Sequence, residues 1–201
     1  MLEILKKTNK LKIPIVIDEA YAGFYKASYI KYINKFKNLI IIRTFSKSFG
    51  LAGLRAGYAV GNAQNIKLMN KFRPMYEINS ISCLAIEFLL NNISLVKKNI
   101  DQVEKSKQFM IKELTKLNIN FINTNANFFH IELGKNVKKF EKVFRKSGIL
   151  FRKGPGVKGF ETYSRFGLGS VKQMKRVLKL VKNVHKKITK PTGIHESTKI
   201  Y

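Results

Sequence analysis

Three short apolar runs in the first third of the chain alternate with polar segments. The run "IPIVI" (13–17) is continuous and rich in β-branched residues, which predicts a buried parallel strand. The runs "NLIIIR" (38–43) and "GYAVG" (57–61) predict two further strands. The polar and aromatic segment between the first two runs predicts a short helix. We therefore expect a mostly parallel sheet with helices in this α/β part of the chain.

From Asn65 onward the apolar residues follow a helical period instead. One predicted helix has apolar residues at Ile81, Leu84, Ala85, Phe88 and Leu89. A second has them at Ile100, Val103, Met110, Leu114 and Leu117.

Near residue 118 the pattern changes again. Short strands are predicted at 119–122, 127–133 and 149–152. Residues 137–147 predict a helix that ends at Gly148. A last helix, capped by Ser170, would bury Val171, Met174, Val177, Leu178 and Val181.

The change of pattern predicts two domains, which 201 residues are enough to form. Residues 1–118 are expected to belong to the larger domain with the mostly parallel sheet. Residues 119–190 are expected to form a smaller α+β domain, and residues 191–201 a disordered tail.

The net charge of +27 could indicate a nucleic-acid partner. The chain also contains 32 lysines, 23 isoleucines and 17 asparagines, which is the bias that an AT-rich genome produces. The basic residues are spread over the whole length, and no nucleic-acid-binding motif occurs. Compositional bias is therefore the favoured explanation, and we expect no specific nucleic-acid partner.

The single cysteine, Cys83, excludes an internal disulfide and fits a reducing compartment. No run of eighteen apolar residues occurs, and the first segment, "MLEILKKTNK", lacks the apolar core of a signal peptide. These features favour the cytoplasm and no membrane partner.

The ends of the predicted strands carry the candidate chemical groups. Ligands of open α/β sheets bind beyond the carboxyl ends of the strands. Asp18 and Tyr21 follow the first strand in "DEAYAGFY" (18–25). A carboxylate in this position can cap a helix, bind a metal or pair with a cation, and the segment alone favours a cap.

The segment "RTFSKSFGLAGLRAGY" (43–58) follows the second strand. A lysine on a buried turn can attack a carbonyl group, although most lysines are solvated. Lys47 lies between Ser46 and a second serine, ahead of glycines that permit close backbone approach. Arg55 offers a forked donor suited to phosphate. The order of residues is not that of a nucleotide-binding P-loop.

A third segment, "RKGPGVKGFETYSRFGLGS" (152–170), places Arg152 and Arg165 on either side of a Gly/Pro turn. Two strands joined by this turn could point both guanidinium groups at one anion. The alternative is a pair of unrelated surface arginines. The chain has only 7 arginines against 32 lysines, which suggests that arginine is used where its fork geometry matters.

Together and in this order, these segments resemble the fold-type I pyridoxal-phosphate aminotransferases, and most closely the histidinol-phosphate aminotransferase branch. The similar segments are "IDEAYAGF", "RTFSKSFGLAGLRAGYAVG", "NANFFHI" and the pair "GILFR" and "SRFGLG". The resemblance extends from about Leu11 to Val184. It implies that residues 1–118 are part of the large cofactor-binding domain and residues 119–190 the small C-terminal domain.

The resemblance also implies roles for individual residues. Lys47 would bind pyridoxal phosphate covalently and later move a proton between the substrate and the cofactor. Asp18 would pair with the pyridinium nitrogen, and Tyr21 would donate to the phenolic oxygen of the cofactor. Ser46 and Arg55 would hold the cofactor phosphate.

The substrate side of the site is implied by the same resemblance. Arg165 would bind the carboxylate or the phosphate of the substrate, with Arg152 assisting. Asn127 lies in the Asn-Phe motif of the family, where a structural role is expected. The partners would be an amino acid and a 2-oxo acid, with a second copy of the chain in a homodimer and no metal.

Two features depart from the family. Gly23 occupies a position where the branch usually has glutamate. The family's chains are also much longer, so we expect this chain to be a C-terminal half that lacks a ring-stacking aromatic residue and a phosphate-binding turn. Such a fragment would leave a sheet edge and apolar surface uncovered, and we expect it not to catalyse transamination alone.

The predicted reaction is amino transfer between an amino acid and a 2-oxo acid or phosphorylated ketone, with histidinol phosphate and 2-oxoglutarate as the expected pair. One alternative is a threonine-phosphate decarboxylase that uses the same Lys47 and Asp18. The other is a non-catalytic basic fragment that binds anions in a strongly salt-dependent way.

Overall fold

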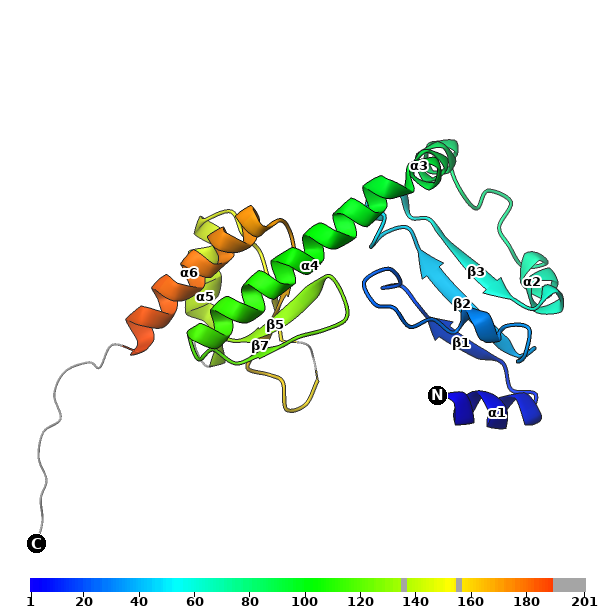
Figure 1. Ribbon diagram of the computed structural model, residues 1–201, viewed down its shortest axis with the longest axis horizontal. Helices are drawn as coiled ribbons and strands as arrows, with labels where there is room; N and C mark the ends of the chain where they lie inside the picture. Colours follow the sequence, from blue (N-terminus) through cyan, green and yellow to red (C-terminus); the bar gives the residue numbers. More distant parts are fainter. Residues whose placement is uncertain (135–136, 155–156, 190–201) are drawn as a thin grey trace, which may run out of the picture. The chain divides into compact units, whose positions relative to one another are not determined.

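The computed structural model of the chain describes residues 1–134, 137–154 and 157–189 (Figure 1). The chain divides into two compact units. Unit 1 comprises residues 1–104 and 124–127, and unit 2 comprises residues 105–123 together with the described residues from 128 to 189. The expected domain boundary at residue 118 stays a prediction, and the predicted tail 191–201 lies outside the described residues.

Unit 1 contains the three predicted strands and the helices that connect them. In chain order its elements are α1 (Leu2–Lys10), β1 (Ile15–Asp18), the 3-10 helix η1 (Ile30–Tyr32), β2 (Leu39–Thr44), the 3-10 helix η2 (Ala52–Leu54), β3 (Gly57–Gly61), α2 (Ala63–Asn70), α3 (Ser80–Asn91) and the first part of α4 (Ile93–Lys116). The sequence analysis did not predict α1, which places Leu5 in a buried cluster with Ile33, Phe36, Leu39 and Ile41.

The sheet of unit 1 has the order β1-β2-β3 (Figure 1). β1 and β2 are parallel, with Asp18 opposite Ile42. β2 and β3 are antiparallel, with Thr44 opposite Gly57. The mixed α/β architecture is as predicted, but the described sheet contains one parallel and one antiparallel pair.

The prediction that the first strand is buried was wrong for one of its faces. Val16 is 58% exposed, whereas Ile15 and Ile17 are half-buried against the cluster around Leu5. The reason is that β1 pairs with one neighbour in the described sheet, and the core cluster covers one side of it.

The apolar stripe of α3 is also exposed, although its helical spacing was predicted correctly. Ile81, Leu84 and Phe88 are 71%, 67% and 58% exposed. The buried positions of this helix are Ser82 and Ile86. Unit 1 therefore presents the uncovered apolar surface that the sequence analysis predicted.

Unit 2 is an antiparallel sheet with helices. After the second part of α4 come β4 (Phe121–Ile122), β5 (Phe128–Glu132), α5 (Val137–Lys146), β6 (Arg152–Lys153), β7 (Tyr163–Gly167) and α6 (Val171–Thr189). The strand order is β4-β5-β7-β6. Buried and less buried residues alternate along β5 and β7, so one face of the sheet forms the core. An aromatic cluster of Phe129, Phe144, Phe151 and Phe166 lies on that face.

The helix ends of unit 2 confirm two local predictions. Gly148 follows α5 with a φ of +69°, a left-handed conformation that glycine adopts without strain. Ser170 caps α6, since its Oγ accepts the Gln173 N–H at 3.2 Å and its own N–H donates to Gln173 Oε1 at 2.7 Å.

No single helix in the described ranges is both long and apolar enough to cross a membrane, and only α3 and α4 taken together, with an 83° bend between them, reach that length and composition.

Candidate active site

The loop between β2 and β3 is folded back on itself by backbone hydrogen bonds. The Phe45 N–H donates to the Ala56 carbonyl at 3.1 Å, and the Leu51 N–H donates to the Phe45 carbonyl at 3.0 Å. The Gly50 N–H closes a tight turn on the Lys47 carbonyl at 3.1 Å. These bonds fix Lys47 on a closed turn beyond the carboxyl end of β2.

Lys47 meets the segment that follows β1. Because β1 and β2 are parallel, their carboxyl ends lie at the same edge of the sheet. The Lys47 Nζ lies 5.6 Å from the centroid of the Tyr21 ring, a cation over an aromatic face. Asp18 accepts the Ala20 N–H through Oδ1 at 2.8 Å in a turn, and no helix begins there, so the predicted helix cap was wrong. The structure thus brings Asp18, Tyr21 and Lys47 to one edge of the sheet.

Ser46 and Arg55 lie at the two ends of the same loop, each next to one partner of the Phe45–Ala56 hydrogen bond. Arg55 has a left-handed backbone, with φ +55° and ψ +37°. This conformation costs a non-glycine residue about 1–2 kcal/mol. Strained residues of this kind cluster at functional sites. Arg55 donates to the Ala52 carbonyl at 3.0 Å and forms no ion pair within the described part of the chain.

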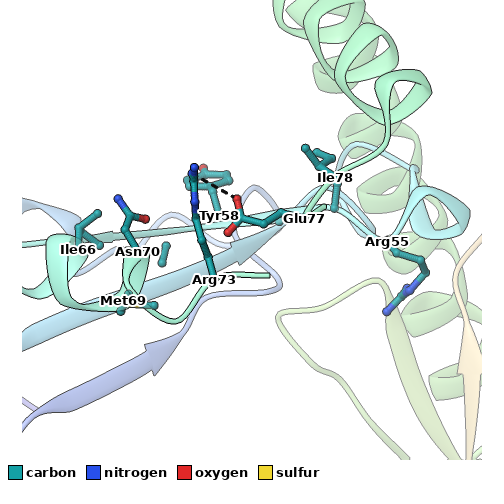
Figure 2. Close-up of a pocket in the computed structure, with 11 residues that line it drawn as sticks. Arg55, Tyr58, Ile66, Met69, Asn70, Arg73, Glu77 and Ile78 are labelled. Carbon is teal, nitrogen blue, oxygen red and sulfur yellow. Dashed lines mark ion pairs between the residues drawn. The ribbon is translucent and has the colours of Figure 1, made fainter. Parts of the chain in front are cut away.

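The pocket drawn in Figure 2, with a volume of about 490 Å³, is separate from Lys47 and Tyr21, which do not line it. Figure 2 shows Arg73 and Glu77 in its lining, joined by an ion pair at 3.6 Å, and Arg55, which also lines the pocket, apart from this pair. Of the predicted site residues, Arg55 lines this pocket, whereas Asp18, Tyr21, Ser46 and Lys47 do not.

Gly23 packs the turn after Tyr21 against the loop of Lys47. Its φ is +100°, and a Cβ on it would lie 3.0 Å from the Ser48 Cβ and 3.2 Å from the Ile100 Cδ1. A glutamate would be strained in this conformation, which gives a physical reason for the glycine. Ser48 is buried, and its carbonyl accepts the Asn99 side-chain amide at 3.1 Å. The sequence analysis missed this support from α4.

A buried ion pair lies directly behind the candidate site. Glu19 is 1% exposed and accepts from Arg43 Nε at 3.1 Å and Nη2 at 2.8 Å. It also accepts from the Ser28 Oγ at 2.9 Å and the Tyr29 N–H at 2.7 Å. Burial opposes the charged guanidinium, but hydrogen bonds that include the one to Glu19 raise the pKa of Arg43. The pair fastens the segment after β1 to the end of β2.

Unit 2 carries the two predicted substrate-binding arginines. Arg152 on β6 lies directly opposite Arg165 on β7, so the two strands pair as predicted. Residues 155–156 of the predicted Gly/Pro turn lie outside the described residues. The Arg165 Cζ lies 5.0 Å from the centroid of the Phe128 ring. Asn127 is half-buried just before β5, and its structural role stays a prediction.

The family model for aminotransferase class I and II matches residues 1–181. The chain belongs to this family. Its members use pyridoxal phosphate.

Curated relatives of this aminotransferase chain carry one name. Histidinol-phosphate aminotransferase from Caldanaerobacter subterraneus subsp. tengcongensis is 35% identical over 84% of this chain and 48% of the relative. The enzyme of the same name from Buchnera aphidicola subsp. Cinara cedri is 34% identical over 90% of this chain and 52% of the relative. The chain spans about half the length of the curated relatives it matches.

Solved structures share the fold of this aminotransferase chain. The histidinol-phosphate aminotransferase from Clostridium acetobutylicum aligns with a TM-score of 0.83 at 24% identity, over 92% of this chain and 58% of that one. The Sinorhizobium meliloti enzyme of the same name was solved with pyridoxal 5'-phosphate. It aligns with a TM-score of 0.77 at 21% identity, over 92% of this chain and 54% of that one. L-threonine-O-3-phosphate decarboxylase from Porphyromonas gingivalis aligns with a TM-score of 0.76 at 22% identity, over 92% of this chain and 58% of that one.

The residues of this aminotransferase chain fit the family cofactor. An amine that reacts with an aldehyde lies over the Tyr21 phenol. A carboxylate lies at the end of the neighbouring strand, and an arginine without an ion-pair partner in the described residues lies on the lysine's own loop. The amine, the carboxylate and the guanidinium match an aldehyde, a protonated ring nitrogen and a phosphate, respectively.

The strand that follows the Lys47 loop requires glycine at position 57. A Cβ there would lie 2.6 Å from the Arg43 carbonyl oxygen, a backbone atom that cannot move aside. We expect Gly57→Ala to lower the free energy of unfolding by about 2 kcal/mol, measured by urea denaturation followed by circular dichroism. Gly53→Ala is the matched control, because nothing lies within 4 Å of its Cβ position. Equal midpoints for the two variants would contradict the steric argument.

Proposed function

We propose that the chain forms part of a pyridoxal-phosphate-dependent aminotransferase that exchanges an amino group between histidinol phosphate and 2-oxoglutarate. The observation that carries the proposal is the position of the Lys47 Nζ over the Tyr21 ring, at the sheet edge where Asp18 ends β1.

The residues divide the work of the proposed reaction. The Lys47 amine would hold the cofactor covalently and, once released, would move a proton between the substrate α-carbon and the cofactor. Asp18 keeps the proton on the ring nitrogen, and Tyr21 donates a hydrogen bond to the phenolic oxygen. Ser46 and Arg55 bind the phosphate. When bound, pyridoxal phosphate supplies an electron-withdrawing ring that stabilises negative charge on the α-carbon.

Arg152 and Arg165 are proposed to bind the anionic group of the substrate. Two guanidinium groups on neighbouring strands can hold a carboxylate or a phosphate through paired hydrogen bonds. A phosphate on the substrate is consistent with the names of the curated relatives, which are histidinol-phosphate aminotransferases.

A homodimer, an amino-acid biosynthetic role and a cytoplasmic location are also proposed. The exposed stripe of Ile81, Leu84 and Phe88 on α3 supports association, because apolar surface of this kind is usually covered in an assembly.

The decisive experiment places the N-terminal half of the Caldanaerobacter relative before this chain and assays the chimera. We expect amino transfer from histidinol phosphate to 2-oxoglutarate, and no transfer by the 201-residue chain alone. Release of carbon dioxide from threonine phosphate, without amino transfer, would replace the proposal with the decarboxylase alternative.

A further inference from the structure

The open face of the sheet in unit 2 carries a row of three basic side chains. His130 on β5 lies opposite Arg165 on β7, and Arg165 lies opposite Arg152 on β6. Residues that are direct partners in an antiparallel sheet point to the same face. The neighbours Phe129 and Phe166 are buried on the other face. The row therefore lies on the less buried side of the sheet.

The row has no acidic partner in the part of the chain that the structure describes. Like charges directly opposite each other in a sheet are destabilising. Neither Arg152 nor Arg165 forms an ion pair with any described residue, and Arg165 contacts the Phe128 ring instead. The nearest carboxylate on the same face of β5 is Glu132, which already accepts from the Asn120 amide at 2.8 Å and the Thr162 hydroxyl at 3.2 Å. An anion from solution would supply the missing countercharge.

His130 is held as a hydrogen-bond donor beside this row. Its Nδ1 is buried without a partner, which favours the neutral tautomer with the proton on Nε2. Its ring meets the Phe128 ring edge-on, with centroids 5.4 Å apart.

Burial and the nearby Arg165 charge lower the pKa of His130. The charged groups around it are Arg165 on β7 and Glu132 on its own strand, while its partner on β4 is the apolar Ile122. The imidazole is therefore neutral at pH 7, and a bound anion would reverse the effect of Arg165.

We propose that His130 is a third ligand of the oxyanion that Arg152 and Arg165 bind, and that its imidazole takes up a proton when that oxyanion is a dianion. The inference rests on the proposed substrate-binding role of the two arginines. A dianion offsets the guanidinium charges and gives the Nε2–H an acceptor. The added proton goes to Nδ1, whose burial opposes it, so the attraction between the dianion and the imidazolium has to exceed that cost. The site would then discriminate a phosphate-like group from a monocarboxylate.

The test uses the full chain, with its histidines labelled with ¹⁵N and followed by NMR as the pH falls from 8 to 5. Sulfate serves as the probe, because it stays a dianion over this range, and acetate is the monoanionic arm. We expect sulfate to raise the titration midpoint of His130 by about one pH unit, as a close opposite charge does. Acetate at equal ionic strength should leave it unchanged.

Variants separate the possible outcomes. His130→Gln identifies the resonance and should make sulfate affinity independent of pH, while His185→Gln on α6 should retain the pH dependence. Arg165→Gln should abolish the sulfate-induced shift. A midpoint that sulfate does not move, in a chain whose sulfate binding still depends on Arg165, would refute the role of His130 and leave the proposed function intact. Sulfate binding that is unchanged in both the His130 and the Arg165 variants would refute the whole anion site. The cofactor chemistry of Lys47 is tested separately, by covalent labelling with pyridoxal phosphate.

Discussion

Replacing Lys47 by alanine is expected to abolish the dominant site at which pyridoxal phosphate attaches to this chain. All 32 lysines carry an amine that reacts with an aldehyde. Only a lysine beside a phosphate-binding residue gains from a second contact, the one between that residue and the cofactor phosphate. An extra binding free energy of about 1.4 kcal/mol from this contact strengthens binding about tenfold. Lys47 lies on the same loop as Ser46 and Arg55. The hydrogen bond between Phe45 and Ala56 draws the two ends of this loop together.

The measurement is reduction with borohydride followed by mass spectrometry of the peptides. The wild-type chain should be labelled at Lys47 before its other lysines, and Lys47→Ala should show the uniform background alone. Lys31→Ala is the matched control, because the Lys31 Nζ lies 5.3 Å from the Tyr32 ring and so reproduces the aromatic contact without the rest of the site. Pyridoxal, which lacks the phosphate, should label Lys47 without preference. Equal labelling of Lys31 and Lys47 by pyridoxal phosphate would show that the setting of Lys47 confers no selectivity.

Removing the Glu19 carboxylate is expected to have the largest effect on stability. Breaking a buried ion pair typically costs about 3–5 kcal/mol, because the remaining charge loses its partner. Arg43 is 22% exposed, so water can compensate part of the loss. We therefore expect Glu19→Ala to destabilise unit 1 by about 3 kcal/mol, the lower end of that range. Glu19→Gln should lose less stability than Glu19→Ala, because the amide oxygen still accepts hydrogen bonds from Ser28 and Tyr29.

Amide hydrogen exchange of β2 measures this loss within unit 1. A change of about 3 kcal/mol corresponds to exchange about 100-fold faster. Glu141→Ala is the control, because that carboxylate pairs with Arg145 and Lys153 on the surface, where ion pairs contribute little. Equal exchange rates in the Glu19 and Glu141 variants would show that the buried pair does not stabilise the sheet.

Local features of the fold were predictable because they depend on neighbouring residues. The cap at Ser170 and the end of α5 at Gly148 follow from short-range hydrogen bonds and backbone freedom. The placement of Asp18 and the loop of Lys47 at one sheet edge followed from one further rule, that parallel strands bring their carboxyl ends to the same edge.

Burial was less predictable, because it depends on what packs against an element. The spacing of Ile81, Leu84 and Phe88 predicted a helix correctly, yet these side chains are exposed and Ser82 is buried. The burial of Glu19 was equally invisible, since a carboxylate after a strand is usually solvated. Its partner Arg43 lies 24 residues away and reaches it only after the two strands pair.

The sequence by itself determined the reactive groups, their order along the chain and the elements that carry them. Tertiary structure alone decided how those groups are supported: the strained backbone of Arg55, the close contact that requires Gly57, and the alignment of His130 with Arg152 and Arg165. The physical reason is that hydrogen-bonding potential and side-chain chemistry belong to each residue, whereas register, close approach and countercharge belong to pairs of residues brought together by folding.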